Sequence, residues 1–229
     1  MKKIILYLLT MMFVFSMATA FAAETTDAPM TVREKMEKIR METDPVYIAA
    51  KAKKMENLPK VAVLYVNNAE TTYNDEVDEV VLGNLAKCIN DDKYVYISGE
   101  PYIERLNKLG IVDISTAERA DIIDAFTGDD VDYVVFVEVQ PFVARDKVTF
   151  FTIGKDMTTT VPLKIIDLVN GKYLYNGKFT EKASDSSMIG GVGNKSVAMK
   201  ALAKVNEQIA SVLAVRLPEE KPVVAAAAK

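Results

Sequence analysis

The segment MIGGVGNKSVAMKAL, residues 188–202, holds the residues from which phosphate-binding loops are built. Such a loop reads G-x-x-x-x-G-K-[ST] after a strand, so that backbone N–H groups and the lysine hold phosphates while the hydroxyl holds Mg²⁺. Lys195 and Ser196 fit its end, but Asn194 and Ile189 occupy the two positions that require glycine. We therefore interpret the segment as a candidate interaction loop instead of a nucleotide site. Its candidate residues are Gly190, Gly191, Gly193, Asn194 and Lys195.

Carboxylates are the other residues with chemical potential, and they cluster in NDEVDE (residues 74–79) and GDDVD (residues 128–132). A calcium loop that began at Asp130 would need glycine at its sixth position, where the chain has Val135. We read both clusters as solvated helix surface and polar turn. The alternative is a small-ligand-binding or hydrolytic site, which would require convergent acids with a raised pKa. Its candidate acids are Asp75, Glu76, Asp129 and Asp130.

A second candidate site lies where the first expected strand ends. Open α/β sheets bind ligands beyond the carboxyl ends of their strands. Asn67 and Asn68 occupy that position here. They are the candidate strand-end site of the ligand-binding alternative.

The residue types that are missing exclude several kinds of chemistry. The chain has no histidine, which removes His-containing triads and His-ligated zinc. It also lacks the G-x-S-x-G, S-x-x-K and C-x-x-C motifs. Cys88 is its one cysteine, so no intramolecular disulfide forms, and its place on an apolar helix stripe predicts a small core residue. We expect no catalytic residue, no cofactor and no metal.

Composition favours a single folded domain. The chain has 229 residues, half of them hydrophobic, which is enough to bury one core. Its formal net charge is −4 and it has no long basic run. Because binding to a phosphate backbone needs a concentrated positive face, we do not expect a nucleic-acid partner.

The N-terminus predicts a signal peptide over residues 1–22. Lys2 and Lys3 precede the apolar run Ile4–Phe15, and Ala20 and Ala22 form the small-residue pattern that signal peptidase cleaves. We expect cleavage after Ala22 and a periplasmic or secreted protein without a stable membrane span. The alternative is an uncleaved anchor, because residues 4–23 carry no charge. Residues 16–24 contain no cysteine, so we expect no lipid anchor.

The first half of the chain predicts alternating helices and strands. Residues 23–58 are expected to form a helical N-terminal segment or stalk, and Lys60–Asn68 a buried strand. The apolar spacing of residues 77, 80, 81, 85 and 88 predicts a helix, and residues 93–98 a second strand. A short helix ends at Gly110. A capping box at residues 115–118 then opens a helix that ends at Gly128.

The second half predicts strands and one long helix. Residues 131–141 are the candidate central strand, followed by a meander of residues 147–153, 158–169 and 172–182. Asn170-Gly171 predicts a type I′ hairpin turn, and Pro162 an edge or a bulge in its strand. An amphipathic helix, with Asn194 or Ser196 as its cap, runs to Pro218. Residues 218–229 are expected to be a disordered tail.

This order predicts the fold class α/β (α+β). We expect a single open mixed sheet of about five to six strands with a C-terminal antiparallel meander and helices packed on it. The domain would span residues 59–217.

The runs KVAVL, YVYIS, ERLNKLGI, VDYVVFVEV and IIDLVNGKYLYNGKF, with the terminal ALAKVNEQIASVLA, resemble a known periplasmic α/β domain. It is shared by CsgG-type curli secretion proteins, LpoB-type penicillin-binding-protein activators and the N-terminal domain of TolB. The resemblance covers residues 58–217 and implies an exported, non-enzymatic cell-envelope module for protein binding or scaffolding. Its partner would be an envelope protein or a second copy. The chain lacks the lipid-bearing cysteine of the curli and activator lipoproteins.

Overall fold

The computed structural model describes residues 53–148, 153–187 and 193–223, which belong to one compact unit that begins at Lys53. Residues 1–52 lie outside the described residues. The expected signal peptide and most of the expected N-terminal helical segment fall there. Gly190 and Gly191 of the candidate interaction loop also lie outside them.

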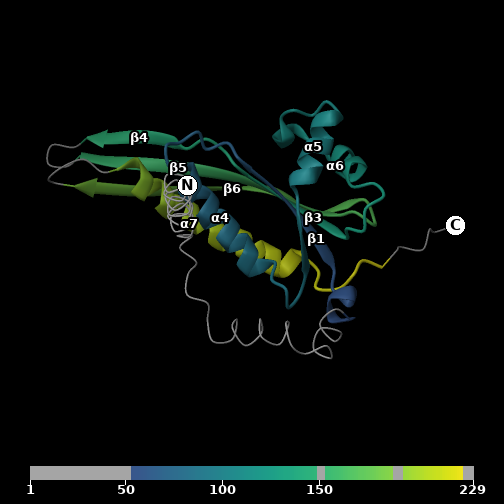
Figure 1. Cartoon of the computed structure of the whole chain (residues 1–229). Coiled ribbons are helices and arrows are strands. Elements are labelled where there is room, and N and C mark those ends of the chain that lie inside the picture. The colour runs from purple at the N-terminus through teal and green to yellow at the C-terminus, as the bar shows by residue number, and fades with distance from the viewer. Residues whose placement is uncertain (1–52, 149–152, 188–192, 224–229) are drawn as a thin grey trace, which may run out of the picture. The chain divides into compact units, whose positions relative to one another are not determined.

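The described residues form one open, mixed six-stranded sheet, as the sequence predicts (Figure 1). The first three strands pair in parallel in the order β2-β1-β3. The remaining pairs are antiparallel, with β5 at their centre. The strands are β1 (Lys60–Asn67), β2 (Val95–Ser98), β3 (Tyr133–Val139), β4 (Val143–Val148), β5 (Ile153–Asp167) and β6 (Lys172–Ser187).

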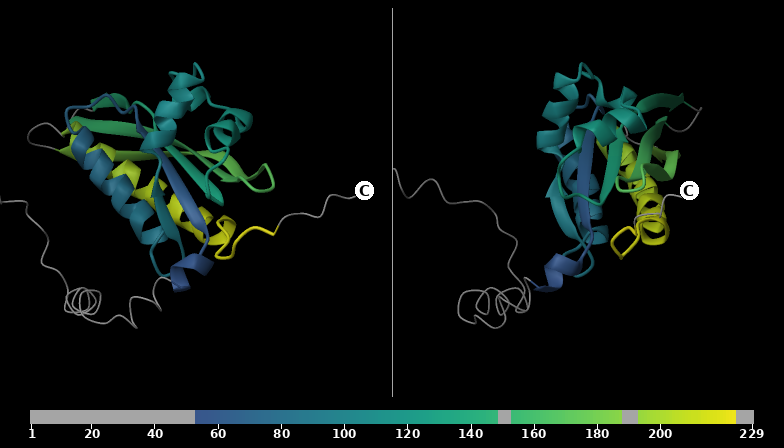
Figure 2. Two further views of the ribbon diagram at one scale, coloured as in Figure 1. Left: turned by 45° about the vertical axis from the view of Figure 1, so that its right-hand side comes forward. Right: turned by 90° about the vertical axis from the view of Figure 1, so that its right-hand side faces the viewer.

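Two pairs of helices cover opposite faces of the sheet (Figures 1 and 2). On one face α4 (Asn74–Cys88) and α7 (Asn194–Arg216) lie side by side. On the other, α5 (Glu100–Lys108), the 3₁₀ turn η1 (Ile114–Thr116) and α6 (Arg119–Ala125) cover mainly β1 and β3. All seven residues of β3 are buried, which confirms the candidate central strand.

One edge of β5 is shared by β3 and β4. Residues 163–167 of β5 pair with β3, and residues 153–158 pair with β4. Of the predicted strand 147–153, residues 147 and 148 are the end of β4, which begins earlier, and residue 153 is the start of β5; residues 149–152 lie outside the described residues. Pro141 lies between β3 and β4, where it cannot donate to a ladder. Pro162 lies between the two paired stretches of β5, while the bulge lies at Ile165/Ile166.

The β5–β6 hairpin is confirmed, but its turn is not type I′. Such a turn needs positive φ at both central residues, and of Asn170 and Gly171 only Gly171 has it, at φ +60°. The turn spans residues 168–171. Asp167 closes it, because its carboxylate accepts from the backbone N–H of Asn170 at 2.9 Å and from its side-chain amide at 2.8 Å.

Two predicted helix caps are also corrected. Residues 114–116 form η1, and the capping box of α6 lies at Glu118 and Asp121, three residues after the predicted one. At the start of α7 the cap position is Gly193, and no side chain caps it. Asn194 instead accepts a hydrogen bond from Lys155 Nζ at 2.5 Å. Ser196 donates to the Gly193 carbonyl at 3.4 Å.

The helix stripes agree with their apolar spacing except at one position. Val77, Val81 and Leu85 of α4 are buried, and Cys88 packs partly buried against the core. Val80 is 37% exposed. Helix α7 ends before Pro218 as predicted.

The start of the predicted tail makes contacts. Tyr133 Oη donates to the Glu220 carbonyl at 3.0 Å, and just before the tail Tyr94 Oη donates to the Leu217 carbonyl at 3.1 Å. Within residues 53–148, 153–187 and 193–223, no helix is long and apolar enough to cross a membrane.

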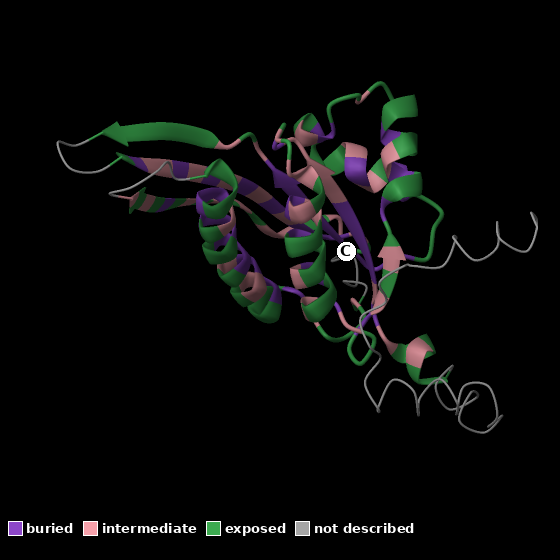
Figure 3. Cartoon of the chain, turned by 60° about the vertical axis from the view of Figure 1, so that its left-hand side comes forward, coloured by how far each residue is buried: buried purple, intermediate pink, exposed green. Residues whose placement is uncertain are grey.

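Burial is lowest on β4, whose six residues are all exposed (Figure 3).

Two glycines make a matched test of this packing. A Cβ added at Gly99 would lie 2.1 Å from the Val63 carbonyl oxygen of β1, whereas one added at Gly83 of α4 meets nothing within 4 Å. We expect Gly99→Ala to lower the free energy of unfolding by about 1–3 kcal/mol or more through overpacking. Gly83→Ala should raise it by about 0.5–1 kcal/mol, because alanine favours a helix interior. Urea denaturation followed by circular dichroism measures both, and an unchanged midpoint in Gly99→Ala would contradict the packing of α5 on β1.

Candidate functional site

The candidate strand-end residues are held in internal hydrogen bonds. Asn67 Nδ2 donates to Asp78 Oδ1 at 2.6 Å and to the Asn74 carbonyl, and Asn67 Oδ1 accepts from the Ala69 backbone N–H. Tyr65 Oη donates to the same Asp78 oxygen at 2.7 Å, and the pKa of Tyr65 is raised by burial and by this bond. These contacts fasten the end of β1 to the first turns of α4.

Asn68 is likewise engaged. Its Nδ2 donates to Glu138 Oε1 at 3.1 Å, and its backbone N–H donates to the Val139 carbonyl at 2.8 Å. Glu138 is buried on β3, so this hydrogen bond satisfies a carboxylate inside the sheet. Both asparagines therefore have a structural role: Asn67 links β1 to α4, and Asn68 links the end of β1 to β3.

The four candidate acids lie in two segments: Asp75 and Glu76 on α4, and Asp129 and Asp130 in the connection between α6 and β3. Glu76 of α4 pairs with Lys195, whereas Asp129 pairs with Arg105 and Asp130 with Lys60. Asp75 is exposed on α4. Within the described ranges no three acids, cysteines or histidines come together as metal ligands would.

The shifted carboxyl pKa values run opposite to those of a general acid. The hydrogen bond from Lys195 lowers the pKa of Glu76, and that from Lys60 lowers the pKa of Asp130. Lysines 182 and 200 act in the same way on Asp156 and Asp185. A proton-donating carboxyl would need burial without such a partner.

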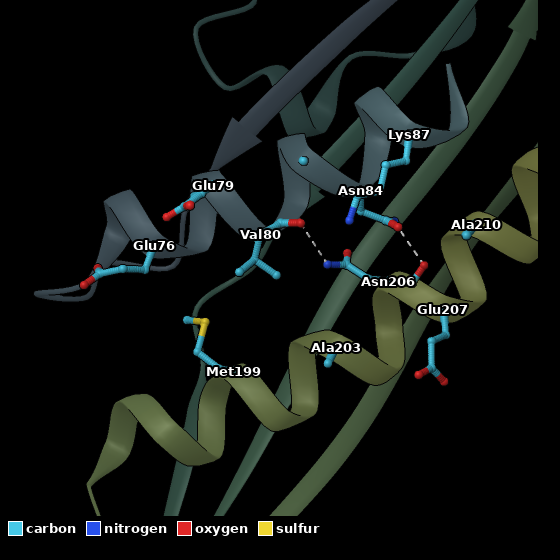
Figure 4. A pocket seen from close by; sticks show the side chains of 11 residues that line it. Glu76, Glu79, Val80, Asn84, Lys87, Met199, Ala203, Asn206, Glu207 and Ala210 are labelled. Atoms are coloured by element: carbon cyan, nitrogen blue, oxygen red, sulfur yellow. Dashed lines mark hydrogen bonds between the residues drawn. The ribbon is translucent and has the colours of Figure 1, made fainter. Parts of the chain in front are cut away.

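An open groove runs between α4 and α7 (Figure 4). It encloses about 690 Å³. Its floor is made of small or apolar side chains and its rim is mostly acidic. The lining residues are Glu76, Glu79, Val80, Gly83, Asn84, Lys87, Met199, Ala203, Asn206, Glu207 and Ala210.

Two asparagines fix the separation of the helices that form this groove. Asn84 Nδ2 of α4 donates to the Asn206 carbonyl at 3.0 Å, and Asn206 Nδ2 of α7 donates to the Val80 carbonyl at 3.2 Å (Figure 4). Asn206 is 7% exposed. Its Oδ1 has no hydrogen-bond partner among the described residues. Two hydrogen bonds thus join α4 and α7 within an otherwise apolar contact.

Gly83 keeps the groove open. It lies in the interior of α4, has no positive φ, and would tolerate a Cβ without a clash. Neither backbone conformation nor packing against the core therefore explains a glycine there, although glycine weakens a helix. The sequence analysis missed this groove. The available sequence signal was Gly83 itself, a glycine inside a helical pattern where no turn is expected.

The described end of the candidate interaction loop lies at one end of this groove. Lys195 forms an ion pair with Glu76, which lines the groove. Asn194 is bound to Lys155 of β5, and Gly193 has open space around its Cβ position. The structure thus brings Gly193, Asn194 and Lys195 close to the groove, whereas Asn67 and Asn68 are not among its lining residues.

A second, polar hollow of about 550 Å³ lies where α6 meets the β5–β6 hairpin. Lys164 enters it from β5 and donates to the Ala117 carbonyl at 2.8 Å. Burial lowers the pKa of Lys164. Arg119 lies over the Tyr173 ring at 5.8 Å. The remaining lining residues are Thr116, Glu118, Ala120 and Asn176.

No family model matches the chain, and no curated protein matches it. Solved structures similar to it include lipoprotein GNA1162 of Neisseria meningitidis, with 16% identity over 67% of this chain and 99% of that one, at a TM-score of 0.40. The LpoB C-terminal domain of Salmonella enterica has 15% identity over 57% and 90%, at 0.32. TolB of Acinetobacter baumannii has 11% identity over 72% and 29%, at 0.34.

The chain is thus similar to LpoB and TolB structures, two of the groups that the sequence resemblance names.

The lysine-paired carboxylates predict acid sensitivity. The pKa values of Glu76 and Asp130 are lowered in the folded protein from ordinary values of 4.5 and 3.8. Their stabilisation is therefore complete above those values and is lost as the pH falls through the lower, folded ones. We expect the urea midpoint to fall between about pH 5 and about pH 3, and salt to weaken this dependence because the pairs are exposed. A midpoint that is unchanged or higher at about pH 3 would contradict it.

Proposed function

We propose that the protein is an exported, non-enzymatic cell-envelope module that binds another protein through the groove between α4 and α7. The observation that carries this proposal is the open groove floor at Gly83 and Val80. A groove of this kind between two helices favours an amphipathic helix, which buries its apolar side against small residues.

The charges at the rim define the kind of helix that fits. Glu76, Glu79 and Lys87 line the groove from α4, and Glu207 lines it from α7 (Figure 4). A partner helix with basic residues beside its apolar face would complement this rim. The apolar floor would provide most of the affinity and the rim would select the partner.

We extend the proposed surface to the candidate interaction loop. Lys195 and Glu76 hold the start of α7 at the end of the groove. A partner in the groove would meet Gly193, Asn194 and Lys195 next. Changing Lys195 would then alter partner binding without opening the hydrophobic core, because Lys195 is exposed.

Blocking the groove tests the proposal. Gly83→Leu fills the floor from a position that meets no other atoms, and Gly83→Ala is its matched control. With a photocrosslinking residue in place of Ala210, the otherwise unchanged chain and the Gly83→Ala chain should capture the same envelope protein in cells. Gly83→Leu should lose it at least about tenfold, because a filled pocket removes the contact at the centre of the interface.

Mass spectrometry of the crosslinked species identifies the partner. Equal capture by Gly83→Leu and Gly83→Ala would contradict the groove as the binding surface. Capture of further copies of this chain alone would assign the groove to self-association.

Export is proposed from residues 1–22, and it has its own test. The protein isolated from cells should begin at Ala23, because signal peptidase reads the small residues Ala20 and Ala22. Intact mass measurement and N-terminal sequencing detect this. A protein that retains Met1 and its apolar run in the membrane fraction would contradict cleavage and support the anchor.

A further inference from the structure

The face of β4, β5 and β6 that points away from α7 differs from the rest of the molecule. Odd-numbered β5 residues such as Met157 pack against α7, so the even-numbered residues between Gly154 and Pro162 point to the opposite side. Helices α5 and α6 cover that side mainly over β1, β3 and Ile166. Among the described residues, no helix therefore covers the projecting part of the three strands on this face (Figure 1).

Positive charge gathers on this open face. Arg145 and Lys147 of β4 stand opposite Asp156 and Gly154 of β5, so they share its face. Lys178 and Lys182 of β6 stand opposite Pro162 and Thr158 and share it too. We call these four cations the basic strip: Arg145, Lys147, Lys178 and Lys182. All four are exposed, although the chain as a whole is acidic.

One acid lies among them on these parts of the three strands. Asp156 pairs with Lys182 at 2.6 Å. No carboxylate within the described ranges forms an ion pair with Arg145, Lys147 or Lys178. Arg145 and Lys178 are therefore left to the solvent or to a partner, whereas Lys147 acts on Asp156 through its charge without forming an ion pair.

The shape of the strip favours a planar partner. Its central lane on β5 holds small or short residues, namely Gly154, Asp156, Thr158 and Thr160. Strand spacing makes it about 10 Å wide, and the rise along the strands makes it about 27 Å long. An extended cationic face with small or short residues between its cations complements an anionic lipid surface.

We propose that the basic strip holds the protein against an anionic membrane surface by peripheral contact. The strip lies on the sheet face opposite α7, so a bound molecule would present the α4–α7 groove away from the lipid. This inference does not depend on the identity of a groove partner, because the two surfaces lie on opposite faces of the sheet. If Lys178 and Lys182 served only to prevent pairing of the edge strand β6 with another chain, their neutralisation would instead cause aggregation.

The test is sedimentation of the protein purified from the envelope with vesicles of stated composition. We expect binding to vesicles that contain phosphatidylglycerol and none to phosphatidylcholine vesicles. Each cation near an anionic surface contributes about fivefold to partitioning, so Arg145→Gln with Lys147→Gln should reduce it about 25-fold. Raising the salt from about 0.1 M to about 1 M should release the protein, because the Debye length falls from about 10 Å to about 3 Å.

Lys108→Gln with Arg216→Gln is the matched control. These residues carry the same charges at the exposed ends of α5 and α7, away from the strip. The control should bind like the unchanged protein, and circular dichroism confirms that both double variants are folded. Equal loss in the control, equal binding to both vesicle types, or no binding to either would overturn the proposal. Binding to immobilised polyglutamate but not to vesicles would also overturn it and would assign the strip to an acidic polypeptide.

Discussion

The burial of β3 on both faces is the constraint on which the rest of the structure depends. Its seven residues are fully inside, so each face of the strand needs its own helical layer. Val135 and Val137 face the layer of α4 and α7, and Val134 and Phe136 face the layer of α5 and α6. The parallel half of the sheet grows from one edge of β3 and the antiparallel half from the other.

Both proposed surfaces follow from how these layers end. α7 continues along β5 and β6 beyond the reach of α6, so among the described residues the projecting parts of β4, β5 and β6 are covered by a helix on one face only. Their open face carries the basic strip. α4 and α7 meet through two asparagines and small side chains, so the contact between them remains an open groove. The fold therefore leaves one apolar and one cationic surface on opposite sides of the sheet.

Much of the fold could be predicted because the local patterns agree with the burial that the sheet imposes. The apolar runs at β1 and β3 predict buried strands. The spacing of Val77, Val81 and Leu85 predicts a helix. The errors fall where tertiary context decides. Pro141 separates β3 from β4 within one extended path, which a local pattern cannot show. The turn at Asn170 follows from the carboxylate of Asp167 instead of from the Asn-Gly pair.

The candidate site was less accessible to sequence reasoning. Asn67 was a reasonable candidate for ligand binding because it lies at the end of a strand. Its amide instead links β1 to α4, and only the structure shows those hydrogen-bond partners. The groove combines residues about 120 positions apart, and its main sign, Gly83, looks like a weak point of a helix.

The most direct measurement is hydrogen–deuterium exchange of the protein with and without detergent-solubilised envelope proteins. We predict new protection in residues 74–88 and 194–216, where the groove helices lie. Protection confined to residues 116–120 and 173–176, around the polar hollow, would contradict the account.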